Sequence, residues 1–226
     1  KIICVDVAHG HHAMMERCLK NLKDDFGDTV HVIAGNVATL EAFDTLARWG
    51  ADSVRVGIGG GSICSTRLVS GHGVPTFQSI LDCARSEHDV KIIADGGIKT
   101  TGDMVKALAA GADFVMVGSM LAGTAETPGQ TFKSAEGKKY KVYRGMASSE
   151  AQNKWRGKSS TPEGVSTTVP YKGKVADILR DIEGGIKSGF SYSGARNLKE
   201  FRAMSSLIRQ TGAGQVESNT HIMLRR

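Results

Sequence analysis

The chain has 226 residues, of which 40% are hydrophobic and 23% are charged, as expected for one globular domain with a substantial core. Its formal net charge of +6 comes from lysines and arginines spread along the chain, and only 6% of its residues are aromatic, so we expect no nucleic-acid partner. No apolar run approaches the roughly 20 residues that cross a bilayer, so we expect no membrane segment and a cytoplasmic protein.

Short segments rich in valine and isoleucine recur along the first half of the chain, which predicts the strands of a parallel sheet covered by helices. These predicted strands are residues 2–7, 31–34, 53–56, 91–94 and 114–117. Helical periodicity lies between them. The predicted helices are residues 13–25, 40–49, 78–86 and 102–110, the last preceded by Thr100 as a cap.

An internal repeat supports this alternation, because the octapeptide at residues 50–57 returns in similar form at residues 111–118. A spacing of two βα units suits a TIM (β/α)₈ barrel, whose ligand loops follow the carboxyl ends of the strands; a doubly wound sheet is the alternative. Five strands cannot close an eight-stranded barrel, so we expect this α/β chain to supply about the last five βα units. Either it is a fragment, or another chain completes it.

A long polar excursion follows at residues 124–174, and its length is typical of a functional flap. Alternating residues at 138–143 and 165–169 predict a hairpin at its base, and helices are predicted to resume at 175–187 and 197–209. Residues 1–226 are therefore interpreted as a single catalytic barrel domain with a flap insertion.

The glycine-rich stretch at residues 57–67 follows a predicted strand and contains Cys64. Glycines let a backbone approach a ligand closely, and a thiol is a strong nucleophile near neutral pH. The alternative is a flexible turn with a small buried cysteine. The other cysteines, at positions 4, 18 and 83, are too far apart for a CxxC pair, so we expect reduced thiols. The loop histidines at 9, 11 and 12 lack a carboxylate at ligand spacing, so they do not predict a zinc site.

Several ordered motifs closely resemble the IMP dehydrogenase/GMP reductase family over nearly the whole chain. They are DVAHGH at residues 6–11, AGNV at 34–37, the loop at 57–67, ADGGI at 94–98, VGSMLAG at 117–123, YRGM at 143–146 and PYKG at 170–173. The resemblance implies a TIM barrel assembled as a homotetramer or homo-octamer, with a purine nucleoside monophosphate as substrate. The CBS regulatory domain of many members is absent from this sequence.

The resemblance also implies roles for individual residues. Cys64 matches the nucleophile that attacks C2 of the purine, and Thr66 and Glu163 match groups that relay protons. The positions that hold the substrate are matched by Ser62, Asp95, Gly96, Gly97, Gly118, Ser119, Tyr143, Gly145 and Met146. The cofactor side is matched by Asp6, Asn36, Gly57, Ile58, Gly59 and Arg67. A potassium ion on the backbone carbonyls of Gly59, Gly61 and Cys64 is a further expectation.

Two reactions share this machinery. A GMP reductase uses NADPH to convert GMP to IMP and ammonia, whereas an IMP dehydrogenase uses NAD and must then hydrolyse its covalent intermediate with a base. The dehydrogenases of the family carry an Arg-Tyr pair in the flap, but residues 147–162 contain Arg156 followed by glycine and no tyrosine. We therefore favour a GMP reductase.

Two alternatives stay open. Residues 211–218 resemble the dehydrogenase tail that supplies carbonyls to potassium in a neighbouring subunit, although a frayed polar tail is an equal interpretation. A catalytically silent nucleotide-binding relative is the other alternative. The presence of Cys64, Thr66 and Glu163 together argues against it.

Overall fold

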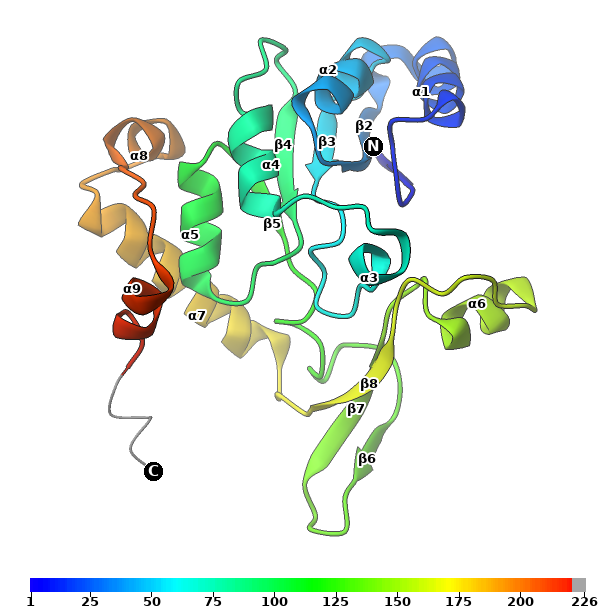
Figure 1. The fold of residues 1–226 in the computed structure, drawn as a ribbon, viewed down its shortest axis with the longest axis vertical. Coiled ribbons are helices and arrows are strands. Elements are labelled where there is room, and N and C mark those ends of the chain that lie inside the picture. Colours follow the sequence, from blue (N-terminus) through cyan, green and yellow to red (C-terminus); the bar gives the residue numbers. More distant parts are fainter. Residues whose placement is uncertain (221–226) are drawn as a thin grey trace.

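The computed structural model describes residues 1–220, so residues 221–226 of the expected single domain lie outside the described part of the chain. Its main element is a five-stranded parallel sheet with the strand order β1-β2-β3-β4-β5 (Figure 1). The strands are β1 Ile2–Asp6, β2 His31–Val37, β3 Ser53–Val56, β4 Lys91–Asp95 and β5 Phe114–Met116. All five predicted strands are confirmed, and β3 has the predicted ends.

Helices follow the strands in the predicted alternation. They are α1 Ala13–Phe26, α2 Leu40–Arg48, α4 Thr76–Cys83 and α5 Thr101–Ala109. Thr100 caps α5 as predicted, because its side chain accepts from the Asp103 N–H and the Asp103 carboxylate accepts from the Thr100 N–H. Two short elements were not predicted, the 3₁₀ turn η1 Gly27–Thr29 and the helix α3 Thr66–Ser70 behind the glycine loop.

The helices cover one face of the sheet and bury the core there. Leu19 of α1, Phe43 of α2, Ile80 of α4 and Met104 of α5 are almost completely buried against Val54 and its neighbours in the strands. Asp6, Arg55 and Asp95 bring charge to the carboxyl ends of the strands, and on the edge strands Ile2 and Phe114 are exposed. Within residues 1–220, β1 and β5 are the two edges of this sheet, so the fold seen is an α/β parallel sheet and closure into a barrel stays a prediction.

The internal repeat has a structural counterpart at the amino-terminal end of the sheet. Asp52 precedes β3, donates its N–H to the carbonyl of Val32 at 2.9 Å and accepts the Val32 N–H on its carboxylate at 2.7 Å. Asp113 precedes β5 and makes the same two bonds with Ile92, at 2.9 and 2.8 Å. We call these two residues the aspartate clasps. Each fixes the register of two neighbouring strands.

Cations stabilise both clasps. Lys23 lies 3.0 Å from the carboxylate of Asp52, and Arg202 lies 3.0 Å from that of Asp113. Burial acts to raise the pKa of Asp52, but the hydrogen bond from the Val32 N–H and the ammonium of Lys23 hold that pKa below its ordinary value. The carboxylate that the clasp requires is thus ionised at neutral pH.

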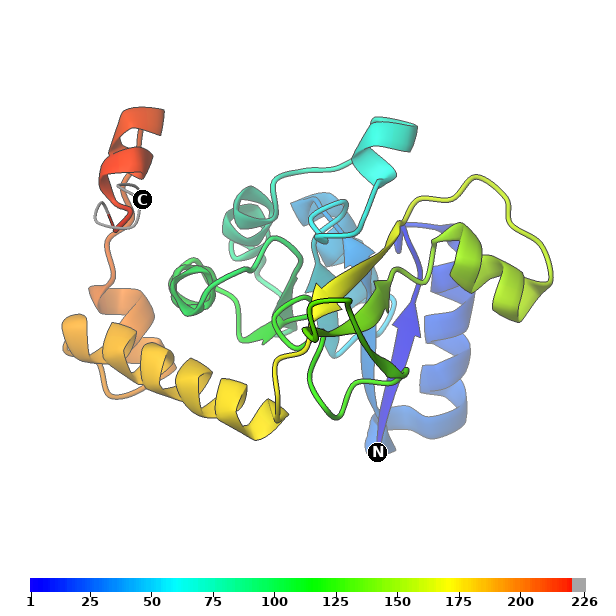
Figure 2. The ribbon, with the colours of Figure 1, turned by 90° about the horizontal axis from the view of Figure 1, so that it is seen from below.

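Residues 124–174 fold into more structure than one hairpin. An antiparallel sheet contains β6 Thr131–Lys133, β7 Lys139–Arg144 and β8 Ser166–Pro170, in the order β6-β7-β8. The predicted pairing at the base of the flap is confirmed by the β7–β8 ladder, whereas β6 and the helix α6 Ser149–Arg156 were not predicted. Figures 1 and 2 show this sheet, the flap sheet, beyond the carboxyl ends of the parallel strands.

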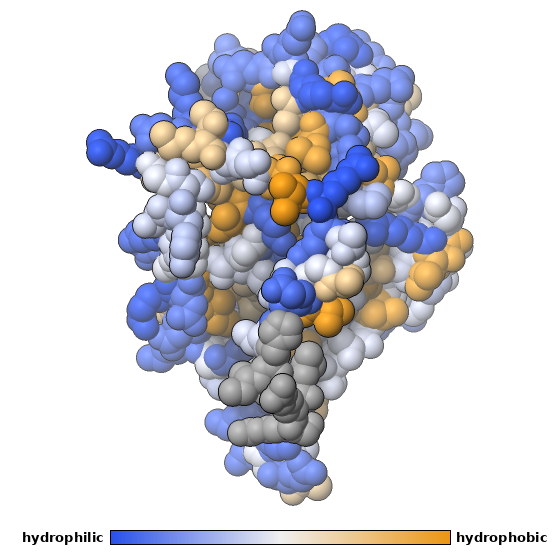
Figure 3. Space-filling model, turned by 60° about the vertical axis from the view of Figure 1, so that its left-hand side comes forward, coloured by the Kyte–Doolittle hydropathy of each residue, from blue (hydrophilic) through white to orange (hydrophobic). Residues whose placement is uncertain are grey.

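Within residues 1–220, three further helices follow the flap sheet, α7 Val175–Tyr192, α8 Leu198–Met204 and α9 Gly212–Glu217. The predicted helix at 197–209 stops at Met204, because Phe201 stacks on Phe190 in a small second core while the following apolar side chains have no such support. Ile208, for example, is 89% exposed, and Figure 3 shows apolar surface on this side of the molecule. Within residues 1–220, no helix combines the length and apolar composition that crossing a membrane requires.

Candidate active site

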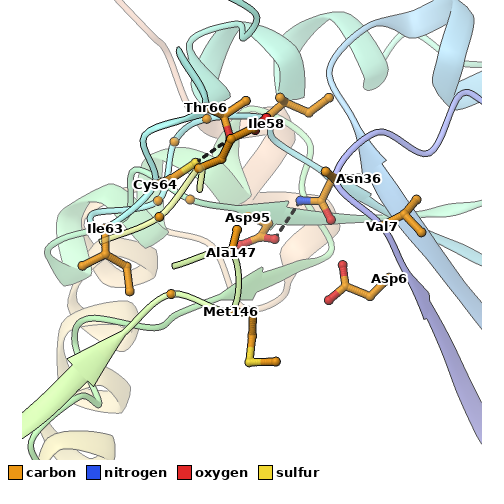
Figure 4. Close-up of a pocket in the computed structure, with 18 of the residues that line it drawn as sticks. Asp6, Val7, Asn36, Ile58, Ile63, Cys64, Thr66, Asp95, Met146 and Ala147 are labelled. Atoms are coloured by element: carbon orange, nitrogen blue, oxygen red, sulfur yellow. Dashed lines mark hydrogen bonds between the residues drawn. The ribbon is translucent and has the colours of Figure 1, made fainter. Parts of the chain in front are cut away.

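A cavity of about 670 Å³ lies between the carboxyl ends of the parallel strands and the flap (Figure 4). The strand loops form one wall, and residues 145–164 form the other. It gathers many of the predicted site residues. Those that line it are Asp6, Asn36, Gly57, Ile58, Gly59, Gly61, Cys64, Thr66, Asp95, Gly96, Gly145, Met146 and Glu163.

Cys64 lies on a tight turn in this wall, since its N–H donates to the carbonyl of Gly61 at 3.1 Å. Its side chain is half-buried, and its Sγ lies 3.2 Å from Oγ1 of Thr66, the first residue of α3. Figure 4 shows both side chains at the cavity. A hydroxyl at hydrogen-bonding distance can accept a hydrogen bond from the thiol and donate its own proton onward, so it can relay a proton to a base.

The flap is hydrogen-bonded directly to the cysteine loop. The Ser65 N–H donates to the carbonyl of Glu163 at 2.9 Å, and the Val165 N–H donates to the carbonyl of Ile63 at 3.0 Å. These bonds hold Glu163 beside the nucleophile although the two residues are far apart in sequence. A partly buried carboxylate thus lines the same cavity as the thiol.

Another cysteine gives a contrast with Cys64. Cys83 is buried in the core behind β4, and desolvation raises the pKa of its thiol to about 12. A thiol with so high a pKa is protonated at neutral pH and inert as a nucleophile. In the described chain, Cys64 is the cysteine that lines the cavity.

A charged network forms the floor of the cavity. Arg55 of β3 lies 2.8 Å from the carboxylate of Asp6 on one side and 2.8 Å from that of Asp95 on the other. Burial alone acts to lower the pKa of Arg55, but its hydrogen bonds with both carboxylates raise it above the ordinary value, so the guanidinium stays charged. Asn36 donates to Asp95 at 2.8 Å, as Figure 4 shows. The network joins the strand ends β1, β2, β3 and β4.

Gly57 is required where β3 leaves the sheet. Its φ is +143°, and a Cβ atom there would lie 1.9 Å from the carbonyl oxygen of Asp95. The loop containing Cys64 therefore begins by touching the backbone of the neighbouring strand. The loop with the thiol and the charged network thus line the same cavity.

We expect Gly57→Ala to displace β3 from β4 and to lower the free energy of unfolding by at least about 2 kcal/mol, because the methyl group overlaps backbone that cannot move freely. Chemical denaturation measures this loss. Gly71→Ala is the matched control, since that glycine also has a positive φ but nothing lies within 4 Å of the position that a Cβ atom would take. If both variants lost the same free energy of unfolding, the positive φ and not the overlap with Asp95 would account for the loss in Gly57→Ala.

A smaller cavity of about 170 Å³ adjoins the first, and we call it the small pocket. Backbone from three strand ends and hydroxyl side chains line it. Its predicted residues are Ser62, Asp95, Gly96, Gly97, Gly118, Ser119 and Tyr143. The hydroxyl of Tyr143 lies 3.4 Å from that of Ser62, so the flap sheet closes one side of this pocket. Its N–H and O–H donors suit a phosphate group.

Arg67 is the predicted site residue that lines neither cavity. Its guanidinium donates to the carbonyls of Ile58 and Val74, and its stem packs against Gly59 and Gly73. The side chain thus joins the two ends of the loop around α3. Its expected contact on the cofactor side stays a prediction.

The expected potassium site on the carbonyls of Gly59, Gly61 and Cys64 stays a prediction. The carbonyl of Gly61 accepts the Cys64 N–H within the turn and keeps a second lone pair. Helix α9 of the same chain lies away from the cysteine loop in Figures 1 and 2, whereas the expected tail contact comes from a neighbouring subunit. Across residues 1–220, no three histidine, cysteine or acidic side chains are grouped as metal ligands.

Sequence reasoning missed several residues of the two cavities. Arg55 lies in an apolar strand, and a charge at such a position is a signal that could have identified it. Lys99 lines the small pocket, and Gln152 and Trp155 of α6 line the large one. Arg156 also lines the large cavity, with its guanidinium 4.2 Å from the ring centre of Trp155. The α6 residues could not be placed without the unpredicted helix.

Comparison with known proteins decides the family. The sequence model of the IMP dehydrogenase / GMP reductase domain matches residues 1–221. The chain belongs to the IMP dehydrogenase/GMP reductase family. Members of this family that resemble it include the inosine-5′-monophosphate dehydrogenase of Aquifex aeolicus, 47% identical, and the GMP reductase of Leishmania major, 46% identical. Both alignments cover 97% of this chain and 47% of the relative.

A solved structure in the family gives the same picture. The chain is similar to a crystal structure of a Cys-to-Ala variant of GMP reductase from Trypanosoma brucei in complex with guanosine 5′-monophosphate, with a TM-score of 0.92 and 45% identity. The match covers 97% of this chain and 47% of that one. The chain thus spans about half the length of the relatives it matches. The family acts on purine nucleotides as oxidoreductases, and relatives of both names match equally well.

Proposed function

We propose that the protein is a GMP reductase that converts GMP to IMP and ammonia with NADPH. One observation carries this choice. The flap that is bonded to the Cys64 loop contains no tyrosine between residues 147 and 162, and its Arg156 lies over the ring of Trp155. An enzyme that hydrolyses its covalent intermediate needs a base to activate water, whereas a reductase gains from not having one.

The residues around the thiol fit the steps of a reductive deamination. Cys64 adds to C2 of the purine, and its proton is relayed through the Thr66 hydroxyl, which accepts a hydrogen bond from the thiol at 3.2 Å, toward Glu163. Glu163 is the carboxylate that exchanges a proton with the leaving ammonia. Asp95, oriented by Arg55 and Asn36, accepts hydrogen bonds from the ribose hydroxyls. The small pocket receives the 5′-phosphate.

The large cavity fits a nicotinamide on its side away from the flap. Oδ1 of Asn36 is buried and has no hydrogen-bond partner among the described residues, so it can accept from a carboxamide N–H. Asp6 also lines this side of the cavity. A bound reduced dinucleotide supplies the hydride that releases IMP from the sulfur. We further propose that the five βα units are part of a (β/α)₈ barrel and that the protein is a homotetramer or homo-octamer.

The test is to follow the absorbance of the nicotinamide with each pair of substrates. We expect NADPH to be oxidised in the presence of GMP, with release of ammonia, and we expect no reduction of NAD with IMP. NADH in place of NADPH measures the dinucleotide preference. Silence in both assays, with GMP still bound, would favour a binding protein without turnover.

IMP dehydrogenase is the second candidate. It is favoured by the relatives of that name, which match at 45–47% identity, and by the resemblance of residues 211–218 to the dehydrogenase tail. Formation of xanthosine monophosphate from IMP and NAD would reverse the proposal.

A further inference from the structure

Two lysines of the flap sheet region are bound to backbone carbonyls behind the small pocket. Nζ of Lys172, just after β8, donates to the carbonyl oxygens of Ser119 at 2.7 Å and Met120 at 3.0 Å. Nζ of Lys141, in β7, donates to Thr124 at 3.0 Å and to two further carbonyls, those of residues 125 and 127. The segment from 119 to 127 is therefore held from the flap side at two points.

The segment held by Lys172 begins with a single turn. The N–H groups of Leu121 and Ala122 both donate to the carbonyl of Gly118 at 3.0 Å. Gly118 and Ser119, at the start of the turn, line the small pocket. The first N–H groups of a helical turn have no hydrogen-bond partner inside the turn. Its carbonyl end carries partial negative charge, which a nearby cation stabilises. Lys172 thus lies at the carbonyl end and the small pocket at the N–H end.

The charges on these lysines are not neutralised by carboxylates. Within residues 1–220, neither Lys141 nor Lys172 forms an ion pair, although Lys141 is only 3% exposed. Desolvation lowers the pKa of Lys172, which is what unpaired burial does to an ammonium. Positive charge without a counter-ion close to a pocket of N–H donors favours an anion in that pocket.

Strand β7, which contains Lys141, also contains Tyr143, a residue that lines the small pocket. Lys141 and Tyr143 are two residues apart in β7, so their side chains lie on one face of the flap sheet. The Tyr143 hydroxyl approaches Gly118, where a Cβ atom would lie 3.3 Å from it. Strand β7 therefore places Tyr143 and Lys141, while Lys172, just after the paired strand β8, holds the turn.

We propose that Lys172 is a positioning residue that holds the turn at residues 118–122 so that its free N–H groups face the 5′-phosphate of the nucleotide. This inference rests on the proposed substrate class, a purine 5′-monophosphate. Lys172 touches carbonyls and not the ligand, so it acts through the turn. Lys141 anchors the residues that follow the turn and limits how far the turn can move.

The test compares the dissociation constants of GMP and guanosine by titration calorimetry without a dinucleotide. We expect Lys172→Met to weaken GMP binding about fivefold, which is the typical effect of the dipole of one turn on a charged group at its end. Guanosine has no phosphate, so we expect its binding to stay unchanged. Lys172→Arg restores most of the GMP affinity, because it keeps donors for both carbonyls. Lys138→Met is the matched control, since Lys138 is an exposed cation in the β6–β7 turn and pairs with Glu136.

An equal loss of GMP and guanosine binding, no loss in Lys172→Met, or the same loss in Lys138→Met would overturn the inference. Because the comparison needs no cofactor, its result is separate from the outcome of the NADPH assay. Wild-type protein that binds guanosine as tightly as GMP would refute a phosphate pocket at residues 118–122 and the inference with it. A thermal melt of each variant checks that the fold is intact.

Discussion

Replacing Cys64 with alanine is expected to lower NADPH-dependent turnover of GMP by at least about 10⁴-fold, because the covalent path is lost with the sulfur. The affinity for GMP is expected to stay within a few-fold of wild type, since the contacts to ribose and phosphate come from other residues. Rapid-mixing kinetics and calorimetry measure the two quantities on the same preparation.

Cys18→Ala is the control for this experiment, because Cys18 lies on α1 and lines neither cavity. It should leave turnover unchanged. Mass spectrometry of wild-type protein with GMP alone should detect a purine adduct on the peptide that contains Cys64. Turnover that survives in Cys64→Ala would contradict the assigned nucleophile.

Replacing Arg55 with methionine is expected to lower the free energy of unfolding by about 3 kcal/mol, since it leaves two carboxylates near each other without their shared cation. The side chain of Arg55 is 13% exposed and that of Asp95 is 20% exposed, so water does not compensate fully. We also expect GMP to bind at least about tenfold more weakly, because Asp95 loses the partner that orients it. Urea denaturation and calorimetry measure these effects.

Arg202→Met provides the comparison, because Arg202 also pairs with a partly buried aspartate, Asp113, but far from the cavity. It should cost stability without weakening GMP binding. Arg55→Met combined with Asp95→Asn should recover part of the lost stability but not the affinity. If both arginine variants weakened GMP binding equally, the loss would follow from general destabilisation and not from the charged network.

The alternation of strands and helices followed from local pattern, because each apolar run is short and is bounded by glycine or a capping residue. Ser53–Val56 shows this well, since its ends are fixed by an Ala-Asp turn and by Gly57. The grouping of Cys64 and Asp95 in one cavity could also be expected, once parallel strands place their loops at one end, whereas Glu163 was expected there only from the family resemblance.

What the sequence did not reveal depends on partners distant along the chain. Helix α6 is short and polar, and although Glu150, Ala151 and Gln152 favour a helix, it lacks the apolar periodicity that predicted the longer helices. The two flap lysines bind backbone carbonyls, which leave no mark in a sequence. The role of Arg55 required knowing that Asp6 and Asp95 flank it on neighbouring strands.

The aspartate clasps have a consequence for how this protein tolerates change. Both lie where the strands begin, at the opposite end of the sheet from Cys64, and each uses an acidic side chain to pin a neighbouring strand. The amino-terminal ends of the strands are thereby held rigidly. The loops at the carboxyl ends can then change in sequence without disturbing how the strands pair. Laboratory evolution of new substrate preference should accordingly accept many changes around the cavity and almost none at Asp52 or Asp113.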